Sequence, residues 1–148
     1  MMYIYYTKEG KFETYVYENI PFNKLNREDG PAITYSDGLA VWYINGKRHR
    51  TDGPAVEQSN GTKEWWVNGK RHRLDFPAIE RPNGSKEWYV NGRGHKLDGP
   101  AVIWGNGDEE WWVNDKKLNT EEVEAWIKDN NINLKTKKHQ ASFMMKFG

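Results

Sequence analysis

The sequence predicts a mainly β protein, an elongated antiparallel meander of stacked β-hairpin repeats with a short C-terminal helix that caps the last hairpin. Three observations lead to this prediction. The chain repeats itself with a period of 23 residues, each period contains Asn-Gly or Asp-Gly pairs, and aromatic residues supply much of the apolar surface. Self-similarity at a fixed period of this length is typical of repeat architectures.

The repeat runs without an insertion from residue 29 to residue 120. Its four copies are 29–51, 52–74, 75–97 and 98–120, and the second and third agree at 14 of 23 positions. Three residue types stay in register: Asp29, Asp52, Asp75 and Asp98; Trp42, Trp65, Trp88 and Trp111; and His49, His72 and His95, which Leu118 replaces in the fourth copy. We expect one repeat domain over residues 1–148.

Each copy has two sites for a tight turn. The first holds Asp37-Gly38, Asn60-Gly61, Asn83-Gly84 or Asn106-Gly107, and the second holds Asn45-Gly46, Asn68-Gly69, Asn91-Gly92 or Asn114-Asp115. Asn-Gly between aromatic or β-branched segments is a strong hairpin signal, because type I′ turns need positive φ at both central residues. We therefore predict two strands per repeat, joined by such turns.

The strand segment KEWWV alternates between the two faces of the sheet. Trp65 and Val67 fall on one face, and Glu64 and Trp66 on the other. We expect the first Trp of each copy to pack in the core. The second aromatic position is the candidate for an exposed stripe and holds Tyr43, Trp66, Tyr89 and Trp112.

The two ends depart from the repeat, as end repeats must to cover open edges. Residues 1–28 predict an N-terminal capping hairpin, and residues 119–148 predict a helical cap and tail. Asn119 and Glu122 resemble a capping box, which opens a helix ending near Asn130. Val123, Trp126 and Ile127 share the helix face that should close the last hairpin. Residues 140–148 fit both a short helix and a strand.

Composition excludes several classes of function. The net charge is only +1, so no strong field favours nucleic acid or an anionic membrane. The chain has no cysteine, which rules out disulfides and thiolate metal sites. We find no signal peptide and no apolar run near the roughly 20 residues of a membrane span, and therefore expect a cytoplasmic protein.

The repeated histidine and aspartate do not predict catalysis or metal binding. Equivalent histidines should lie about 10 Å apart, two strand spacings, too far to share one metal ion. No Ser or Cys nucleophile recurs beside them. We expect each His to bond the loop after its turn and each Asp to bond its own backbone before Gly-Pro. The expectation is a protein with no catalytic residue, no metal and no cofactor.

Repeated Arg, Trp and Tyr instead favour a surface that binds another protein, since these residues are enriched at binding hot spots. The candidate binding residues are Arg48, Arg50, Trp66, Arg71, Arg73, Tyr89, Arg93, Lys96 and Trp112. One alternative is a basic stripe that binds phosphates of anionic phospholipid or nucleic acid. The glutamates on neighbouring strands argue against this alternative. A more distant alternative is choline or carbohydrate held between aromatic pairs. Sheet edges or the C-terminal tail could also join copies in a homo-oligomer.

At WYINGKRHRTDGPA (42–55) and WWVNGKRHRLDFPA (65–78) the chain resembles the MORN family (membrane occupation and recognition nexus). The shared pattern is an aromatic strand, an Asn-Gly-Lys turn, a basic residue with His, and a 23-residue period, and it covers residues 27–120. The D-G-P-A variant is similar to repeat proteins of phages and giant viruses.

The resemblance implies stacked hairpins in an elongated, curved sheet that scaffolds other proteins and carries no catalytic residue. For a viral protein it implies a partner in the host cytoplasm, such as a defence or toxin component. The family's Gly-x-Gly step is replaced here by Asp-Gly-Pro, or by Asp-Phe-Pro at 75–77, which argues against lipid binding.

Overall fold

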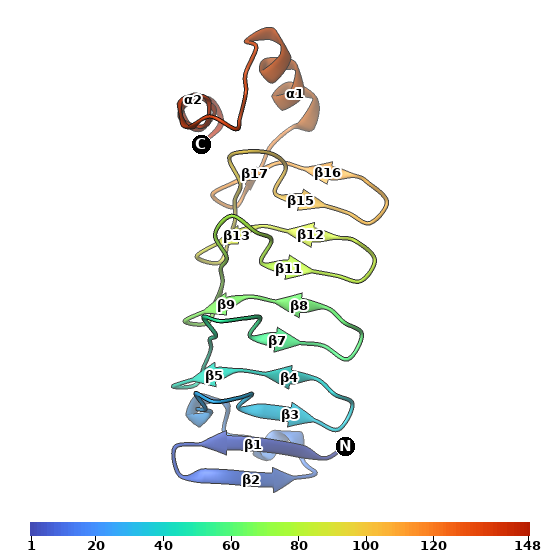
Figure 1. Cartoon of the computed structure of the whole chain (residues 1–148), viewed down its shortest axis with the longest axis vertical. Coiled ribbons are helices and arrows are strands. Elements are labelled where there is room, and N and C mark those ends of the chain that lie inside the picture. Colours follow the sequence, from blue (N-terminus) through green and yellow to red (C-terminus); the bar gives the residue numbers. More distant parts are fainter.

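The computed structural model describes residues 1–148 and has the predicted mainly β architecture. Hairpins succeed one another along a ladder that starts at the N-terminal hairpin and ends at two C-terminal helices (Figure 1). Ten strands form one antiparallel sheet in the order β16-β15-β12-β11-β8-β7-β4-β3-β1-β2. Their bounds are β1 (Tyr3–Thr7), β2 (Gly10–Thr14), β3 (Ile33–Tyr35), β4 (Ala40–Val41), β7 (Val56–Glu57), β8 (Lys63–Glu64), β11 (Ile79–Glu80), β12 (Lys86–Glu87), β15 (Val102–Ile103) and β16 (Glu109–Glu110).

Each repeat adds a second hairpin beside this sheet, so it contains four short strands rather than the predicted two. These hairpins are β5 (Tyr43–Ile44) with β6 (Lys47–Arg48), β9 (Trp66–Val67) with β10 (Lys70–Arg71), β13 (Tyr89–Val90) with β14 (Arg93–Gly94), and β17 (Trp112–Val113) with β18 (Lys116–Lys117). The chain changes strand partner at the first Trp. There the Trp65 backbone N–H bonds the Ala78 carbonyl of the next repeat at 2.8 Å, and the following residues pair as strands within their own hairpin. Single backbone bonds, such as that from the Arg50 N–H to the Trp66 carbonyl at 3.1 Å, join neighbouring second hairpins.

The two turns of a repeat differ in type. In the second turn both central residues have positive φ, such as Asn45 (50°) and Gly46 (74°), as a type I′ turn requires. In the first turn only the glycine does, such as Gly61 (88°), and the Asn60 side chain accepts the Thr62 backbone N–H at 2.9 Å. The prediction of a type I′ geometry is therefore confirmed for the second turn and wrong for the first, which is a three-residue loop.

The ends fold largely as predicted. Strands β1 and β2 form the N-terminal hairpin, and two 3-10 turns follow it, η1 (Tyr17–Asn19) and η2 (Phe22–Lys24). The predicted helix is α1 (Thr120–Asp129), where the Asn119 side chain accepts the Glu122 backbone N–H at 2.8 Å. The ambiguous tail is also helical and belongs to α2 (Lys137–Phe147). Neither helix has the length and apolar composition needed to cross a membrane.

The ladder has two chemically distinct faces. Strand register places one residue of each strand from β3 to β16 in a single row: Ile33, Val41, Val56, Glu64, Ile79, Glu87, Val102 and Glu110. Directly paired residues lie on the same face, and we call it the Glu face. The opposite side carries Trp42, Trp65, Trp88 and Trp111, and we call it the Trp face.

The apolar core is split between the two ends of the ladder. At the N-terminal end, residues before the first repeat cover the Glu face; Phe22 lies against Tyr43 there, with ring centroids 6.5 Å apart, and both belong to one cluster around Ile33. At the C-terminal end, α1 and α2 cover the Trp face of the fourth repeat and bury Trp111 and Val113. The middle repeats have no such cluster of their own.

The prediction of a buried first Trp and an exposed second aromatic is wrong for the first three repeats, and in the fourth only the burial of the first Trp is confirmed. Trp42, Trp65 and Trp88 are half-buried, as are Trp66, Tyr89 and Trp112. Only where an end cap covers them do rings become buried: Tyr43 is 8% exposed and Trp111 is 6% exposed. The two aromatic positions occupy opposite faces, and each face is covered at one end only.

We expect Gly46→Ala to lower the urea midpoint of unfolding more than Gly92→Ala. Both glycines have positive φ (74° and 83°), which costs an L-residue about 1–2 kcal/mol. At Gly46 an added Cβ would also collide with the Asn23 carbonyl, whereas at Gly92 its nearest neighbour is the Lys70 Cβ at 3.5 Å. Equal losses in the two variants would contradict this account of the turn.

Candidate interaction groove

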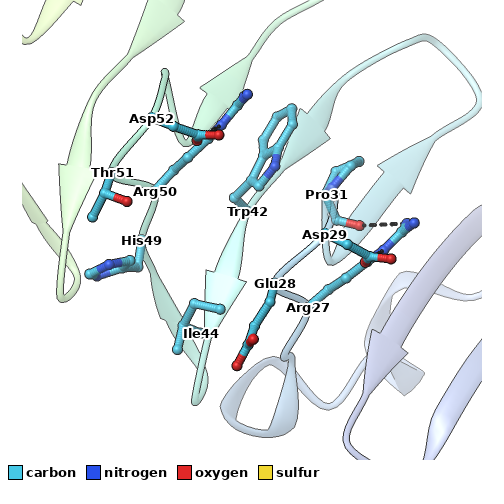
Figure 2. Close-up of a pocket in the computed structure, with 11 residues that line it drawn as sticks. Arg27, Glu28, Asp29, Pro31, Trp42, Ile44, His49, Arg50, Thr51 and Asp52 are labelled. Atoms are coloured by element: carbon cyan, nitrogen blue, oxygen red, sulfur yellow. Dashed lines mark hydrogen bonds and ion pairs between the residues drawn. The ribbon is translucent and has the colours of Figure 1, made fainter.

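A hollow of 690 Å³ lies on the Trp face of the first repeat (Figure 2). Trp42 stands in it between two loops, one running from Arg27 to Pro31 and the other from His49 to Asp52. Ile44 lines the hollow beside the Trp ring. The hollow is therefore an aromatic and aliphatic surface with charged loops at its edges.

The same hollow recurs along the ladder. Its second copy, of 650 Å³, is lined by Trp65, Val67 and His72, and its third, of 390 Å³, by Trp88, Val90 and His95. Because equivalent residues line each copy, we name the three together the Trp groove. The third copy is smaller, and Lys137 and Gln140 of α2 line it as well.

One arginine per repeat fixes the wall of the groove. The Arg50 guanidinium lies 4.2 Å from the centre of the Trp42 ring in its own repeat. It also reaches the next repeat, where Nε donates to Asp52 Oδ1 at 2.8 Å and Nη1 donates to the Pro54 carbonyl and to Glu57 Oε1, both at 3.1 Å. A cation stacked on tryptophan thus links each repeat to the following one.

Equivalent cations repeat this arrangement at each junction. Arg73 lies 3.7 Å from the Trp65 ring centre, and Lys96 Nζ lies 4.0 Å from that of Trp88. At the N-terminal end Arg27 lies 4.0 Å from the Tyr6 ring centre. Burial against Trp88 lowers the pKa of Lys96. No Trp ring stacks directly on the Trp ring of a neighbouring repeat, and a cation lies over the ring instead.

The repeated Asp has a different role from the one predicted. Its main partner is the arginine two residues earlier: Asp52 accepts the Arg50 Nε–H, and Asp29 accepts the Arg27 Nε–H at 2.8 Å. The hydrogen bond from the arginine lowers the pKa of each carboxyl. The glycine that follows leaves room for the guanidinium: a Cβ on Gly53 would lie 2.8 Å from the Arg50 Cζ.

The third repeat departs from this pattern because Phe76 replaces the glycine. Asp75 takes a positive φ of 63°, and Arg73 forms no ion pair with it. The Arg73 guanidinium instead lies between two rings, 3.7 Å from Trp65 and 5.0 Å from Phe76, and still bonds the Pro77 carbonyl at 3.1 Å. Phe76 and the neighbouring Leu74 are exposed at the groove edge, and the Asp75 carboxylate is left without a cation.

The histidines bond a neighbouring repeat rather than the loop after their own turn. His49 Nδ1 accepts the Asn68 backbone N–H at 3.2 Å, and His72 and His95 bond Asn91 and Asn114 in the same way. Burial lowers the pKa of His95. No group of three or more His, Asp or Glu side chains comes together to hold a metal ion.

The predicted binding residues do not form one surface. Three of them, Arg50, Arg73 and Lys96, line the Trp groove. Arg93 is exposed and is paired with Val90 across the β13–β14 hairpin. The other five lie on the Glu face: Arg48, Trp66, Arg71, Tyr89 and Trp112.

On the Glu face these side chains satisfy one another. Trp66 Nε1 and Arg71 Nε both donate to Glu64 Oε2, at 3.0 and 3.2 Å. Arg48 lies on the other side of the Trp66 ring, 4.9 Å from its centre. Tyr89 donates to Glu87 at 2.9 Å, and burial together with that carboxylate raises the pKa of Tyr89 to about 12. This face has one large hollow, of 760 Å³, at its N-terminal end, and it does not recur in the other repeats.

Sequence reasoning missed the residues that make the groove, namely Trp42, Trp65 and Trp88 with Ile44, Val67 and Val90. The available signal was the fixed separation between each Trp and the cation eight residues later. In the fourth repeat the equivalent surface is Trp111, Val113 and Leu118, and the two helices bury it; the Phe143 ring lies 5.7 Å from that of Trp111.

No protein-family model, curated protein or solved structure matches the chain.

We expect stability to fall as the pH drops from 7.5 to 5.0, and His95→Gln to flatten this dependence. Because folding lowers the pKa of His95 below its ordinary 6.5, the unfolded chain binds more protons in this range, which favours unfolding. Asp29, Asp52 and Glu110, whose pKa values lie below 3.8, 3.8 and 4.5, act only at more acidic pH. Thermal unfolding at both pH values measures the effect, and an unchanged slope in the variant would contradict it.

Proposed function

We propose that this chain is a non-enzymatic module that binds another protein through the Trp groove. One observation carries the proposal. The groove recurs in three repeats as an open surface, while in the fourth repeat the chain covers the equivalent surface with its own helices.

The chemistry of the groove supports a protein as its occupant. Each hollow offers a half-buried Trp and an aliphatic side chain, and the second and third share the rim residue Leu74, which is 63% exposed. Apolar anchors with a polar rim are typical of interface centres. The stacked arginines hold the Trp rings in place before binding, so little side-chain freedom remains to be lost.

Phosphate binding has less support from the contacts. Arg50, Arg71 and Arg73 already bond Glu57, Glu64 and Glu80. On the second hairpins, Arg71 and Lys117 have an ion-pair partner, and the cations without one are Lys47, Arg48, Lys70, Arg93 and Lys116. Binding of anionic lipid or nucleic acid would rest on these, and its affinity would fall steeply with salt.

The resemblance to MORN-like proteins of phages and giant viruses extends the proposal to the partner. On that basis we propose a host protein, such as a component of defence or of a toxin system, met in the host cytoplasm. The resemblance supports the kind of partner, and the groove supports the surface that binds it.

We expect Leu74→Asp to reduce the capture of this partner at least tenfold, because it places a charge on the apolar rim of the groove. Affinity capture of the tagged full chain from cells, followed by quantitative mass spectrometry, measures the loss. Met145→Asp is the matched control, because Met145 is 90% exposed on α2, away from the groove.

A partner captured equally by wild-type and Leu74→Asp would contradict the groove as its binding surface. Vesicles containing phosphatidylserine and a labelled oligonucleotide, each tested at 50 and 200 mM salt, examine the phosphate alternative. Salt-sensitive binding that Leu74→Asp leaves unchanged would favour that alternative.

A further inference from the structure

We infer that the occupant of the Trp groove is an amphipathic helix of the partner, bound as α1 and α2 bind the fourth repeat. This inference rests on the proposed function and adds the chemistry of the partner segment. The covered fourth repeat and the open third repeat beside it present equivalent residues.

The covered repeat shows how its Trp face is filled. Phe143 of α2 is fully buried against Trp111, and Trp126 of α1 lies behind it with ring centroids 6.1 Å apart. Phe147 lies one helical turn after Phe143 and is also buried, and the centroids of the two rings are 5.0 Å apart. Leu97, on the loop before the repeat, packs against the same cluster. Apolar residues four positions apart on one helix thus supply the anchor.

Two polar contacts orient the cap on this surface. Lys135, just before α2, lies 3.5 Å from Asp98 of the covered repeat. At the other end of α2, Lys116 Nζ donates to the Phe147 carbonyl at 3.4 Å. A cation near the C-terminus of a helix interacts favourably with its unsatisfied carbonyls. The covered repeat therefore binds a basic residue at one edge and a helix C-terminus at the other.

The open third repeat has equivalent residues at each of these positions. Asp98, Trp111, Val113 and Lys116 of the covered repeat correspond to Asp75, Trp88, Val90 and Arg93, and Leu97 just before it corresponds to Leu74. The substitution of Phe76 for glycine leaves the Asp75 carboxylate without its arginine, so it can bind an incoming cation as Asp98 does. Arg93 is exposed and has no ion-pair partner. Lys116 is also exposed, and its bond to the Phe147 carbonyl is its contact with the cap.

The covered and open repeats differ at one position of the groove. The covered repeat has the apolar Leu118 where the third repeat has His95, which is half-buried. The open groove is thus more polar at this position than the covered one, which suits a helix that binds and dissociates better than a permanent cap. The partner helix should carry an aromatic residue, an apolar residue one turn later, and a basic residue about two turns before it, as Lys135 precedes Phe143.

A labelled synthetic peptide of residues 119–148, added to the full-length chain, tests this inference by fluorescence anisotropy. We expect saturable binding that weakens at least tenfold when the peptide carries Phe143→Ala. It should weaken as much when the protein carries Leu74→Asp, and Met145→Asp in the protein should leave it unchanged.

Two results would overturn the inference. One is no binding of the peptide to the wild-type chain. The other is binding that Leu74→Asp leaves unchanged, because the peptide would then have replaced the chain's own cap on the fourth repeat. If the peptide fails while partner capture still depends on Leu74, the proposed function stands and only the helical occupant is wrong.

Discussion

A cation stacked on tryptophan joins each repeat of this protein to the next. Arg50 lies on Trp42 and bonds Asp52, Pro54 and Glu57 of the following repeat, so one side chain spans the junction. Desolvated cation–π contacts contribute about 0.5–2 kcal/mol each. With apolar clusters only at the two ends, the middle repeats depend on these links and on backbone bonds between neighbours.

The stacked cations also determine which surface is available for binding. They hold the Trp rings upright with hollows between successive loops, whereas on the Glu face the rings bond carboxylates and fill their own space. The N-terminal turns cover the Glu face and the C-terminal helices cover the Trp face. The Trp groove is left open over the first three repeats, and its fourth position supplies an example of how it can be filled.

Much of the fold could be predicted from residues that act locally. Asn45-Gly46 determines its turn because both residues adopt positive φ, and Asn119 begins α1 because its side chain caps the helix. The break of each strand at the first Trp could not be predicted, because it depends on a backbone bond to an alanine one repeat away. The alternation within KEWWV correctly placed Trp65 and Trp66 on opposite faces of the sheet. The exposure of the aromatic rings could not be predicted, because it depends on end caps that are distant in sequence.

The candidate site was harder to predict for the same reason. Arg48 and Arg50 look equivalent in the sequence, yet they lie against Trp66 on the Glu face and Trp42 on the Trp face. The ring that each arginine contacts depends on the path of the backbone after the second hairpin. Two arginines of the same residue type give no indication of that path. The effect of Phe76 on Asp75 likewise depends on how closely a guanidinium approaches the neighbouring glycine in the other repeats.

A double-mutant cycle on Arg73→Met and Trp65→Leu, measured by urea unfolding, tests whether the cation that reaches the next repeat is held by the tryptophan ring of its own repeat. We expect a favourable coupling free energy of about 1 kcal/mol between the two side chains, beyond the cost of each single change. A coupling of zero would mean that the cation and the ring stabilise the protein independently, and that the stacked cation does not hold the repeats together.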